Sequence, residues 1–496
     1  MTPGRIVAFL ILVLSLLGLL GFIPPEQGLS IGEKLTLRFP SPTEIISPER
    51  QEQVDISDIL ELEANADEIV ALDTLVLDTL VPAALAPLEE RIALHYPNGD
   101  KSVLYALFSK LEKARNQKRP LRILHYGDSQ LEGDRITSYI RNKFQTQFGG
   151  VGPGLFAVSD IVPSFSVERS LAGDWIRYSV MNKRDPHQLH TRFGVLSSYS
   201  RFTPLLPDSI LLDTTVHSAS LTVNPQQRAF SKSKSFSTCK LFFGWHNAPV
   251  RIDLHQGDEL LSTEVVQPAE RLLIREWKFQ TTPDQLTFTF TGTDSPDIYA
   301  ISLEGSTGVN VDNIASRGAS GYEFHAVDQT LLRTMYADLG VELLILQYGG
   351  NVLPNIKSTE QAESYGHFFG AQIARFRRLI PGVTIIVIGP SDMSIKEGED
   401  YVTRPFLEDV RDAMKANTLE QGAVFWDMYD AMGGMNSMVS WVDADPPLAA
   451  TDYTHFTPKG ARKIGELFYN AFQSDHTLFR ANATLPKMKK DTIDVP

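Results

Sequence analysis

The sequence has almost no cysteine and no concentrated positive charge. One residue of 496 is a cysteine, Cys239, which excludes an internal disulfide bond and a thiolate metal cluster. A single cysteine of this kind is typically a small buried hydrophobic residue. Lysine and arginine together number 46 against 60 acidic residues, and no block of them is long enough to follow a phosphate backbone. The net charge of −14 and this lack of a basic block argue against nucleic acid as a partner.

The acidic residues do not form a metal-binding pattern either. Asp427, Asp430 and Asp443 lie close together in the sequence, but their spacing matches no known set of ligands. The sequence therefore predicts neither a metal ion nor another cofactor. It gives no indication of an oligomeric state.

A long apolar run occupies most of residues 1–23. Ile6 to Ile23 are 18 consecutive apolar, glycine or serine residues, preceded by Arg5 and followed by two prolines. This length just reaches the roughly 17–25 residues of a bilayer span. The run lacks a small-residue cleavage site, which favours an uncleaved inner-membrane anchor at residues 6–23 over the alternative, a cleaved signal peptide. Arg5 then places the rest of the chain outside the cytoplasm, in the periplasm or at the cell surface.

Residues 24–95 are strongly acidic. Between Glu26 and Arg91 there are 15 acidic and four basic residues, and prolines recur. Such a charge resists compaction, so a solvated stalk or linker is expected over 24–95.

Strand and helix patterns alternate in residues 96–155 and 305–475. Short apolar runs typical of buried strands are followed by helical apolar spacing. The runs are 121–126, 309–314, 342–348, 383–388 and 423–427. This alternation predicts a three-layer α/β/α domain, in which helices cover both faces of a parallel sheet.

Residues 156–304, between these two parts, have a different pattern. Runs rich in β-branched and aromatic residues alternate with turn signals, and helical periodicity is nearly absent. The runs are 218–223, 240–245, 250–254, 286–291 and 298–303. We expect an inserted β-sandwich of the jelly-roll kind, similar to a carbohydrate-binding module. Residues 476–496 are expected to form a C-terminal tail.

Five residues with catalytic chemistry follow predicted strands or lie in the last loop. They are Ser129, Gly321, Asn351, Asp452 and His455. Residues at the carboxyl ends of parallel strands meet at one edge of the sheet. Acyl transfer through a serine ester needs such a set: a hydroxyl, a base, a carboxylate that orients the base, and donors for the oxyanion.

The order and local sequences of these residues resemble the SGNH/GDSL hydrolase superfamily, which has a flavodoxin-like fold. Its sequence blocks match Gly127-Asp128-Ser129, a glycine, Gly349-Gly350-Asn351 and Asp452-Tyr453-Thr454-His455. The resemblance implies that Ser129 is the nucleophile, His455 its base and Asp452 the orienting carboxylate. It also implies an oxyanion hole made by Ser129, Gly321 and Asn351, with Gly318 as the alternative glycine.

Two positions depart from the family pattern. Gln130 stands where leucine is common, and we expect this change to alter only the pocket wall. Val352 follows Asn351 where many members have aspartate, which removes a supporting carboxylate from that loop.

A closer resemblance is to bacterial peptidoglycan O-acetylesterases that carry an inserted β-sandwich. It rests on the segments 125–129, 133–137 and 148–154 and on the position of the insertion. This resemblance implies a serine esterase that removes O-acetyl groups from peptidoglycan or extracellular polysaccharide. One alternative is a polysaccharide O-acetyltransferase that uses the same triad. Another is a non-catalytic glycan-binding protein.

Overall fold

The computed structural model describes residues 3–20, 29–31, 35–37, 53–61, 86–206 and 214–484, which fall in two units, 1–53 and 54–496. The first unit contains helix α1 (Pro3–Leu20) and an antiparallel pair of strands, β1 (Leu29–Ile31) and β2 (Leu35–Leu37). Within the described residues no helix combines the length and apolarity that a membrane crossing requires. The membrane anchor predicted over residues 6–23 therefore lacks support from the structure.

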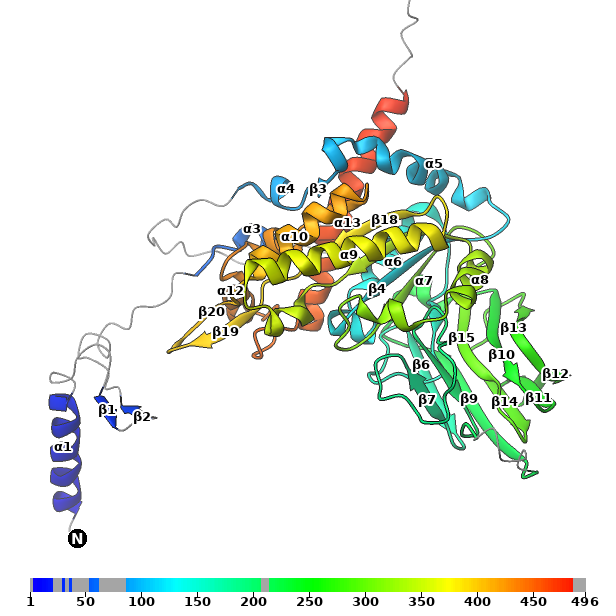
Figure 1. The fold of residues 1–496 in the computed structure, drawn as a ribbon, viewed down its shortest axis with the longest axis horizontal. Coiled ribbons are helices and arrows are strands. Elements are labelled where there is room, and N and C mark those ends of the chain that lie inside the picture. The colour runs from blue at the N-terminus through cyan, green and yellow to red at the C-terminus, as the bar shows by residue number, and fades with distance from the viewer. Residues whose placement is uncertain are drawn as a thin grey trace, which may run out of the picture. The chain divides into compact units, whose positions relative to one another are not determined.

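A six-stranded sheet with five parallel strands lies at the centre of the second unit (Figure 1). Its strand order is β16-β4-β17-β18-β21-β3, and only the edge strand β3 is antiparallel. The strands are β16 (Val309–Ala315), β4 (Leu121–Gly127), β17 (Val341–Gln347), β18 (Thr384–Ile388), β21 (Val424–Trp426) and β3 (Leu94–His95). The five parallel strands are the five that the sequence predicts, so the α/β class is confirmed.

Helices cover both faces of this sheet. Leu344 and Leu346 of β17 belong to one buried cluster, whereas Leu343 and Ile345 belong to the other, because successive strand residues point to opposite faces. One face packs against α8 (Gln329–Leu339), α9 (Thr359–Leu379) and α10 (Leu407–Glu420). The other packs against α5 (Tyr105–Lys113), α6 (Thr137–Phe148) and α13 (Pro458–Thr484).

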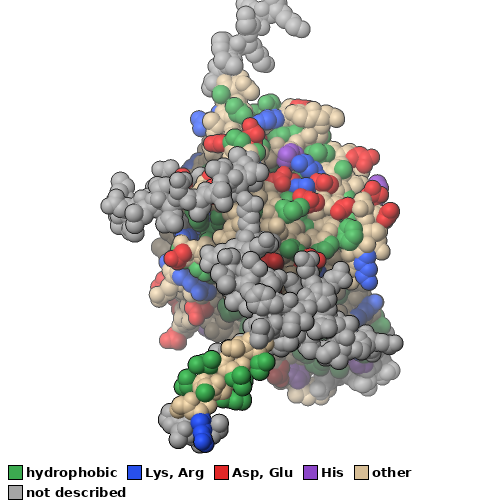
Figure 2. All heavy atoms as spheres, turned by 90° about the vertical axis from the view of Figure 1, so that its left-hand side faces the viewer, with side chains coloured by type: hydrophobic (Ala, Val, Ile, Leu, Met, Phe, Trp, Pro, Cys, Tyr) green, Lys and Arg blue, Asp and Glu red, His purple; other side chains and the backbone are tan. Residues whose placement is uncertain are grey.

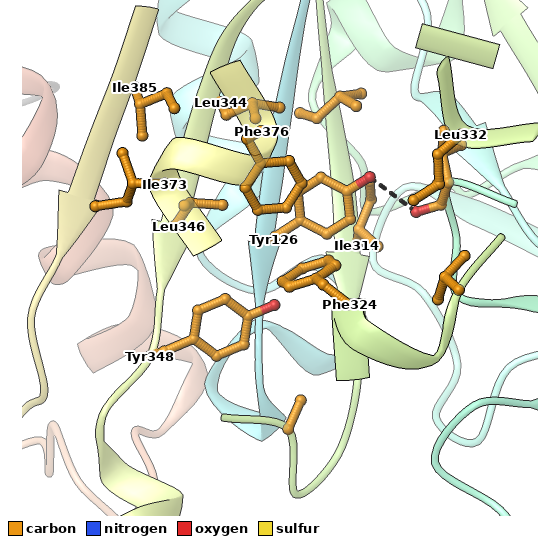
Figure 3. Close-up of a cluster of buried hydrophobic side chains, with 14 of the residues drawn as sticks. Tyr126, Ile314, Phe324, Leu332, Leu344, Leu346, Tyr348, Ile373, Phe376 and Ile385 are labelled. Atoms are coloured by element: carbon orange, nitrogen blue, oxygen red, sulfur yellow. Dashed lines mark hydrogen bonds between the residues drawn. The ribbon is translucent and has the colours of Figure 1, made fainter. Parts of the chain in front are cut away.

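A group of aromatic side chains packs on the sheet face that α8, α9 and α10 cover, close to the end of β4. Tyr126 packs against both Phe376 of α9 and Phe324 of the short helix η6 (Tyr322–Ala326) (Figure 3). The Phe324 and Phe376 rings meet edge to face, with centroids 4.7 Å apart. Their packing holds the segment before α8 against the sheet, directly after the loop that carries the candidate glycines.

Residues 154–206 and 214–304 form two antiparallel sheets with a shared core. One has the order β13-β10-β15-β8-β7, with β5 beside β15, and the other β12-β11-β14-β9-β6. In β14, Leu286, Phe288 and Phe290 alternate with partly exposed residues and pack with both sheets. The strands are β5 (Gly154–Phe156), β6 (Val167–Ala172), β7 (Ile176–Ser179), β8 (Ser198–Arg201), β9 (His217–Pro225), β10 (Thr238–His246), β11 (Val250–Gln256), β12 (Glu259–Val266), β13 (Ala269–Lys278), β14 (Leu286–Gly292) and β15 (Asp297–Glu304). Cys239 is buried in this core, as predicted.

A buried group of charges joins the antiparallel strand β15 to the parallel sheet. Arg122 of β4 donates hydrogen bonds to Asp312 of β16, at 2.8 Å, and to Glu304 at the end of β15. All three side chains are at most 2% exposed. Lys240 of β10 also contacts Glu304, at 2.5 Å. Because burial is unfavourable for a charge without a partner, this contact ties the two regions together.

Two stretches of the predicted stalk belong to the second unit. Ile59, in helix α3 (Ser57–Glu61), and Leu94 in β3 are buried in the same core as α13. β3 pairs with β21 and adds a strand to the sheet. The part of the predicted stalk between them, 62–85, lies outside the described residues.

The last helix, α13, continues past residue 475 into the segment that the sequence analysis expects to form a C-terminal tail. Asp475 accepts hydrogen bonds from Tyr96 and Lys101, both at 2.6 Å, and His476 packs edge to face against Phe108 and Phe148. These contacts come from distant segments, so α13 extends to Thr484 although its local pattern weakens.

Acidic and basic side chains are interspersed on the face of the described part that Figure 2 presents. Ion pairs on the second unit, such as Arg275 with Glu264 and Arg317 with Glu132, follow the same mixed arrangement. This surface agrees with the lack of a basic block in the sequence.

Candidate active site

The candidate nucleophile follows the central strand β4. Gly127 ends the strand, and Ser129 begins a short 3-10 helix, η5 (Ser129–Asp134), that precedes α6. The Asp128 carboxylate accepts a hydrogen bond from the Gln130 backbone N–H at 2.9 Å and so caps this turn. The hydroxyl of Ser129 therefore projects from a fixed turn at the carboxyl edge of the sheet.

The candidate base lies in the loop before α13. Asp452 Oδ1 accepts hydrogen bonds from the backbone N–H groups of Thr454 and His455, both at 3.0 Å. Tyr453 between them has a positive φ of 54° and stacks on Tyr401, with ring centroids 3.6 Å apart. Tyr401 belongs to a hairpin of β19 (Ser394–Glu397) and β20 (Asp400–Thr403), and Ser394 donates a backbone hydrogen bond to the Tyr453 carbonyl at 3.0 Å. The hairpin thus supports the loop from outside.

The structure brings these two loops into contact. Ser129 Oγ lies 2.9 Å from His455 Nε2, and His455 Nδ1 lies 2.8 Å from Asp452 Oδ2. When Nδ1–H is donated to the carboxylate, Nε2 is left as the acceptor for the serine hydroxyl. This is the relation of nucleophile, base and orienting carboxylate that acyl transfer through a serine requires.

The charge of Asp452 is favoured by its hydrogen bonds. Its partial burial alone would raise the pKa, but the hydrogen bonds from His455 and Thr454 outweigh that effect and hold the pKa of Asp452 below its usual range. The carboxylate is therefore ionised whenever His455 needs a negatively charged partner.

Two side chains that the sequence did not mark as functional hold the loops together. Gln130 donates to the Thr454 carbonyl at 2.7 Å and accepts from the Phe456 N–H at 3.4 Å. Arg135 donates to the Ser129 carbonyl at 2.7 Å and to the Phe456 carbonyl at 3.0 Å. The expectation that Gln130 alters only the pocket wall is therefore wrong, because its amide joins the nucleophile turn to the histidine loop.

Replacing Gln130 with leucine should lower kcat for an acetyl ester about tenfold, with a smaller effect on KM. Leucine keeps much of the side-chain volume but loses both hydrogen bonds to the His455 loop, and small misplacements of a catalytic group are costly. Gln145→Leu is the matched control, since it removes another buried amide, bonded to the Gly152 carbonyl, from outside the cavity. Steady-state kinetics of both variants test the prediction, and an equal loss in the two would contradict it.

A cavity of about 760 Å³ opens over the serine. Ser129, His455, Asn351 and Gly318 all line it, together with Arg317. Gly321, the preferred glycine of the sequence analysis, is not among its lining residues; it directly precedes η6 and lies against the Phe369 ring. The structure therefore favours Gly318, the alternative, because its backbone faces the same cavity as the hydroxyl.

Asn351 reaches the cavity through a glycine turn after β17. Gly349 has a φ of +116°, and a Cβ there would lie 2.9 Å from Met414 Sδ, so a side chain is excluded on both counts. The Asn351 Nδ2 group donates to Asp128 Oδ2 at 2.9 Å and to the Ala319 carbonyl at 3.0 Å. The amide is thus held between the serine turn and the loop that carries Gly318.

Asp128 beneath the serine is buried, and its burial raises the pKa to about 6. The hydrogen bond from Gln130 and the neighbouring His455 oppose this effect, whereas the nearby carboxylate of Glu323 adds to it. At neutral pH Asp128 is largely ionised and accepts from Asn351.

Asp128 should make the protein less stable as the pH rises, relative to Asp128→Asn. A carboxyl group whose pKa is higher in the folded state favours folding while it is protonated, and this contribution is lost between its ordinary value of 3.8 and about 6. The free energy of unfolding, measured in urea at several pH values from 4 to about 7, should fall for the wild type relative to the variant. A difference that stays constant over this range would contradict the prediction.

Comparisons with known proteins agree with this fold. Neither a family model nor a curated protein matches the sequence. A solved structure of a peptidoglycan O-acetylesterase superposes with a TM-score of 0.60 and 19% identity, over 78% of this chain and 99% of that one. This likeness shows that the chain shares the fold of a peptidoglycan O-acetylesterase, the kind of protein that the sequence motifs resemble.

Two other solved structures show weaker likeness. A protein described as a GDSL-like lipase from Bacteroides ovatus has a TM-score of 0.25 and 12% identity, over 52% of this chain and 85% of that one. A family two carbohydrate esterase from Clostridium thermocellum, in complex with cellohexaose, has a TM-score of 0.24 and 7% identity, over 61% and 98% of the two chains.

Proposed function

We propose that this chain is a serine esterase that removes O-acetyl groups from peptidoglycan or another extracytoplasmic polysaccharide. The observation that carries the proposal is the contact of Ser129 Oγ with His455 Nε2 at 2.9 Å, with Asp452 behind the imidazole, inside an open cavity. The fold of a peptidoglycan O-acetylesterase supports the choice of substrate class. A non-catalytic role would leave this geometry without a purpose.

The reaction begins with attack by the serine oxygen. His455 removes the Ser129 proton as the oxygen bonds to the acetyl carbon, and the carbonyl oxygen becomes an oxyanion. The backbone N–H groups of Ser129 and Gly318 and the Asn351 amide stabilise that charge. Collapse of this intermediate breaks the bond to the sugar oxygen, which takes the proton from His455 and leaves an acetylated serine. Water, deprotonated by His455, then releases acetate and restores Ser129.

The two antiparallel sheets suit an accessory role in this function. We propose that residues 156–304 form an inserted β-sandwich, similar to a carbohydrate-binding module, that holds glycan beside the catalytic cavity. Support comes from their common core and from the position of these strands in the chain, after β4 and α6 and before the chain returns to the parallel sheet at β16.

Acetate release from polysaccharide tests the proposed function. The full chain, incubated with O-acetylated peptidoglycan and with O-acetylated xylan, should release free acetate from at least one of them. An unacetylated oligosaccharide added as acceptor distinguishes hydrolysis from acetyl transfer, since a transferase would acetylate it. No acetate from any acetylated polysaccharide, or acetyl found mainly on the acceptor, would overturn the esterase assignment.

A further inference from the structure

A second cavity adjoins the one over Ser129. It has a volume of about 220 Å³ and lies between η5, the segment 160–166, strands β7 and β8, and the end of β16. Glu132, Gly133, Val162 and Arg317 line both cavities. The antiparallel sheet and the catalytic loops thus share one continuous recess. Complete ligand sites usually occupy about 300–1,000 Å³, so the smaller cavity suits one part of a ligand that also fills the larger one.

Most charges around the second cavity are matched. Three arginines at or beside its wall are each paired with a carboxylate: Arg141 with Asp134, Arg169 with Asp160, and Arg317 with Glu132. These pairs are close, at 2.5 to 2.7 Å, and contribute no net charge to the recess. A fourth arginine, Arg177 of β7, also lines the cavity and stands apart from this arrangement.

Arg177 has no carboxylate within ion-pair distance in the described part of the chain. Its Nε is buried and makes no hydrogen bond there, and its Nη2 reaches only Ser198 Oγ, at 3.3 Å. Burial lowers the pKa of Arg177, against the attraction of the more distant Asp160, as expected for a guanidinium in a site with too little negative charge. A buried donor without an acceptor is costly, and a bound anion would remove that cost.

We propose that this cavity binds the carboxylate of an anionic sugar, a neighbour of the acetylated sugar on the same glycan. The inference rests on the proposed function for its link to catalysis. The planar fork of a guanidinium matches a carboxylate in geometry. The second cavity carries a single unmatched positive charge, and Asp160 lies close by, so a singly charged carboxylate fits better than a doubly charged phosphate. The chain would then select glycans that place a sugar acid beside the ester.

Binding to the full chain carrying Ser129→Ala tests the proposal without turnover. The probes are digalacturonate and N-acetylmuramate, each compared with its methyl ester by calorimetry. At least one acid should bind about tenfold to a hundredfold more tightly than its ester, the range expected for a charge-assisted hydrogen bond. The two acids distinguish a uronic acid from an ether-linked sugar acid. Equal binding of acid and ester in both pairs would overturn the proposal.

Variants of Arg177 show whether the preference comes from this residue. Adding Arg177→Met or Arg177→Gln to the Ser129→Ala chain should abolish the preference for the acid over its ester. Arg333→Met, which changes an exposed arginine of α8, should leave this preference intact. Gln fills a similar space and stays polar, so a folded variant is available even if Met destabilises the cavity. A preference that survives both Arg177 substitutions would contradict the proposal.

The same variants separate this proposal from the proposed function. In the wild-type background, Arg177→Gln should leave hydrolysis of p-nitrophenyl acetate unchanged, because that ester carries no sugar acid. An Arg177-dependent preference in a chain that releases no acetate would sustain the binding site and refute the esterase. Acetate release without an Arg177-dependent preference would support the esterase and refute the carboxylate-binding site.

Discussion

Replacing Ser129 with alanine should lower kcat for an acetyl ester about 10⁴- to 10⁶-fold. The substitution removes the oxygen that attacks the ester and leaves His455, 2.9 Å away, without a proton to accept. Hydrolysis of p-nitrophenyl acetate followed by absorbance measures the loss. Activity within tenfold of the wild type would refute the assignment of the nucleophile.

Two further variants separate a catalytic effect from a structural one. Ser109→Ala removes a hydroxyl that bonds only within α5 and should leave kcat unchanged. Ser129→Ala combined with His455→Ala should be no slower than Ser129→Ala alone, because residues that act as one unit show strongly non-additive losses. If the losses in kcat of the two single variants multiplied in the double variant, the two side chains would act independently.

Replacing Arg122 with methionine should reduce the free energy of unfolding by about 3–5 kcal/mol. The variant leaves the carboxylates of Asp312 and Glu304 buried without their main partner, and breaking a buried ion pair from one side has a cost of this size. Lys240 still contacts Glu304, so most of this loss in stability should come from the carboxylate of Asp312. Urea unfolding followed by far-UV circular dichroism measures the change.

Arg275→Met is the matched control for that substitution. Arg275 makes a bidentate pair with Glu264 at 2.7 Å, but both side chains are more than 30% exposed. Exposed pairs contribute about 0–1 kcal/mol, so the control should lose little stability. A loss of less than about 1 kcal/mol in Arg122→Met as well would show that β15 and the parallel sheet are held together by apolar packing alone.

The positions of Ser129, Asp452 and His455 could be predicted because strand periodicity carries topological information. Each parallel strand is a short apolar run, and the residues after such runs meet at one sheet edge whatever their separation in sequence. Local pattern and motif therefore brought together side chains that are 326 residues apart.

The supporting contacts could not be predicted in the same way. Gln130 and Arg135 act through backbone carbonyls of the His455 loop. Because every residue has a backbone carbonyl, the sequence does not indicate which one accepts a hydrogen bond. The choice between Gly318 and Gly321 likewise depends on which backbone faces the cavity. The one available signal was a polar residue directly after the nucleophile, at the position where the family pattern has leucine.

The acidic segment shows a limit of composition as a guide. Its net charge predicts solvation from residue 24 to 95, yet Ile59 and Leu94 are buried. Their partners, the strand β21 and the face that carries α13, lie more than 300 residues away. A few apolar residues in an acidic segment are enough to dock it where a distant edge is open.

The two hydrogen bonds of Asn351 have a consequence for which esters are cleaved well. Both amide hydrogens are engaged, one by Asp128 and the other by the Ala319 carbonyl. An acyl oxygen that recruits this amide must displace one of them, and the displaced group loses a donor. A bulky glycan can offset that loss through contacts far from the ester, whereas a small synthetic acetate has none to contribute. Chromogenic reporters will therefore understate the catalytic capacity of this protein, and its true efficiency will emerge only on long saccharide chains.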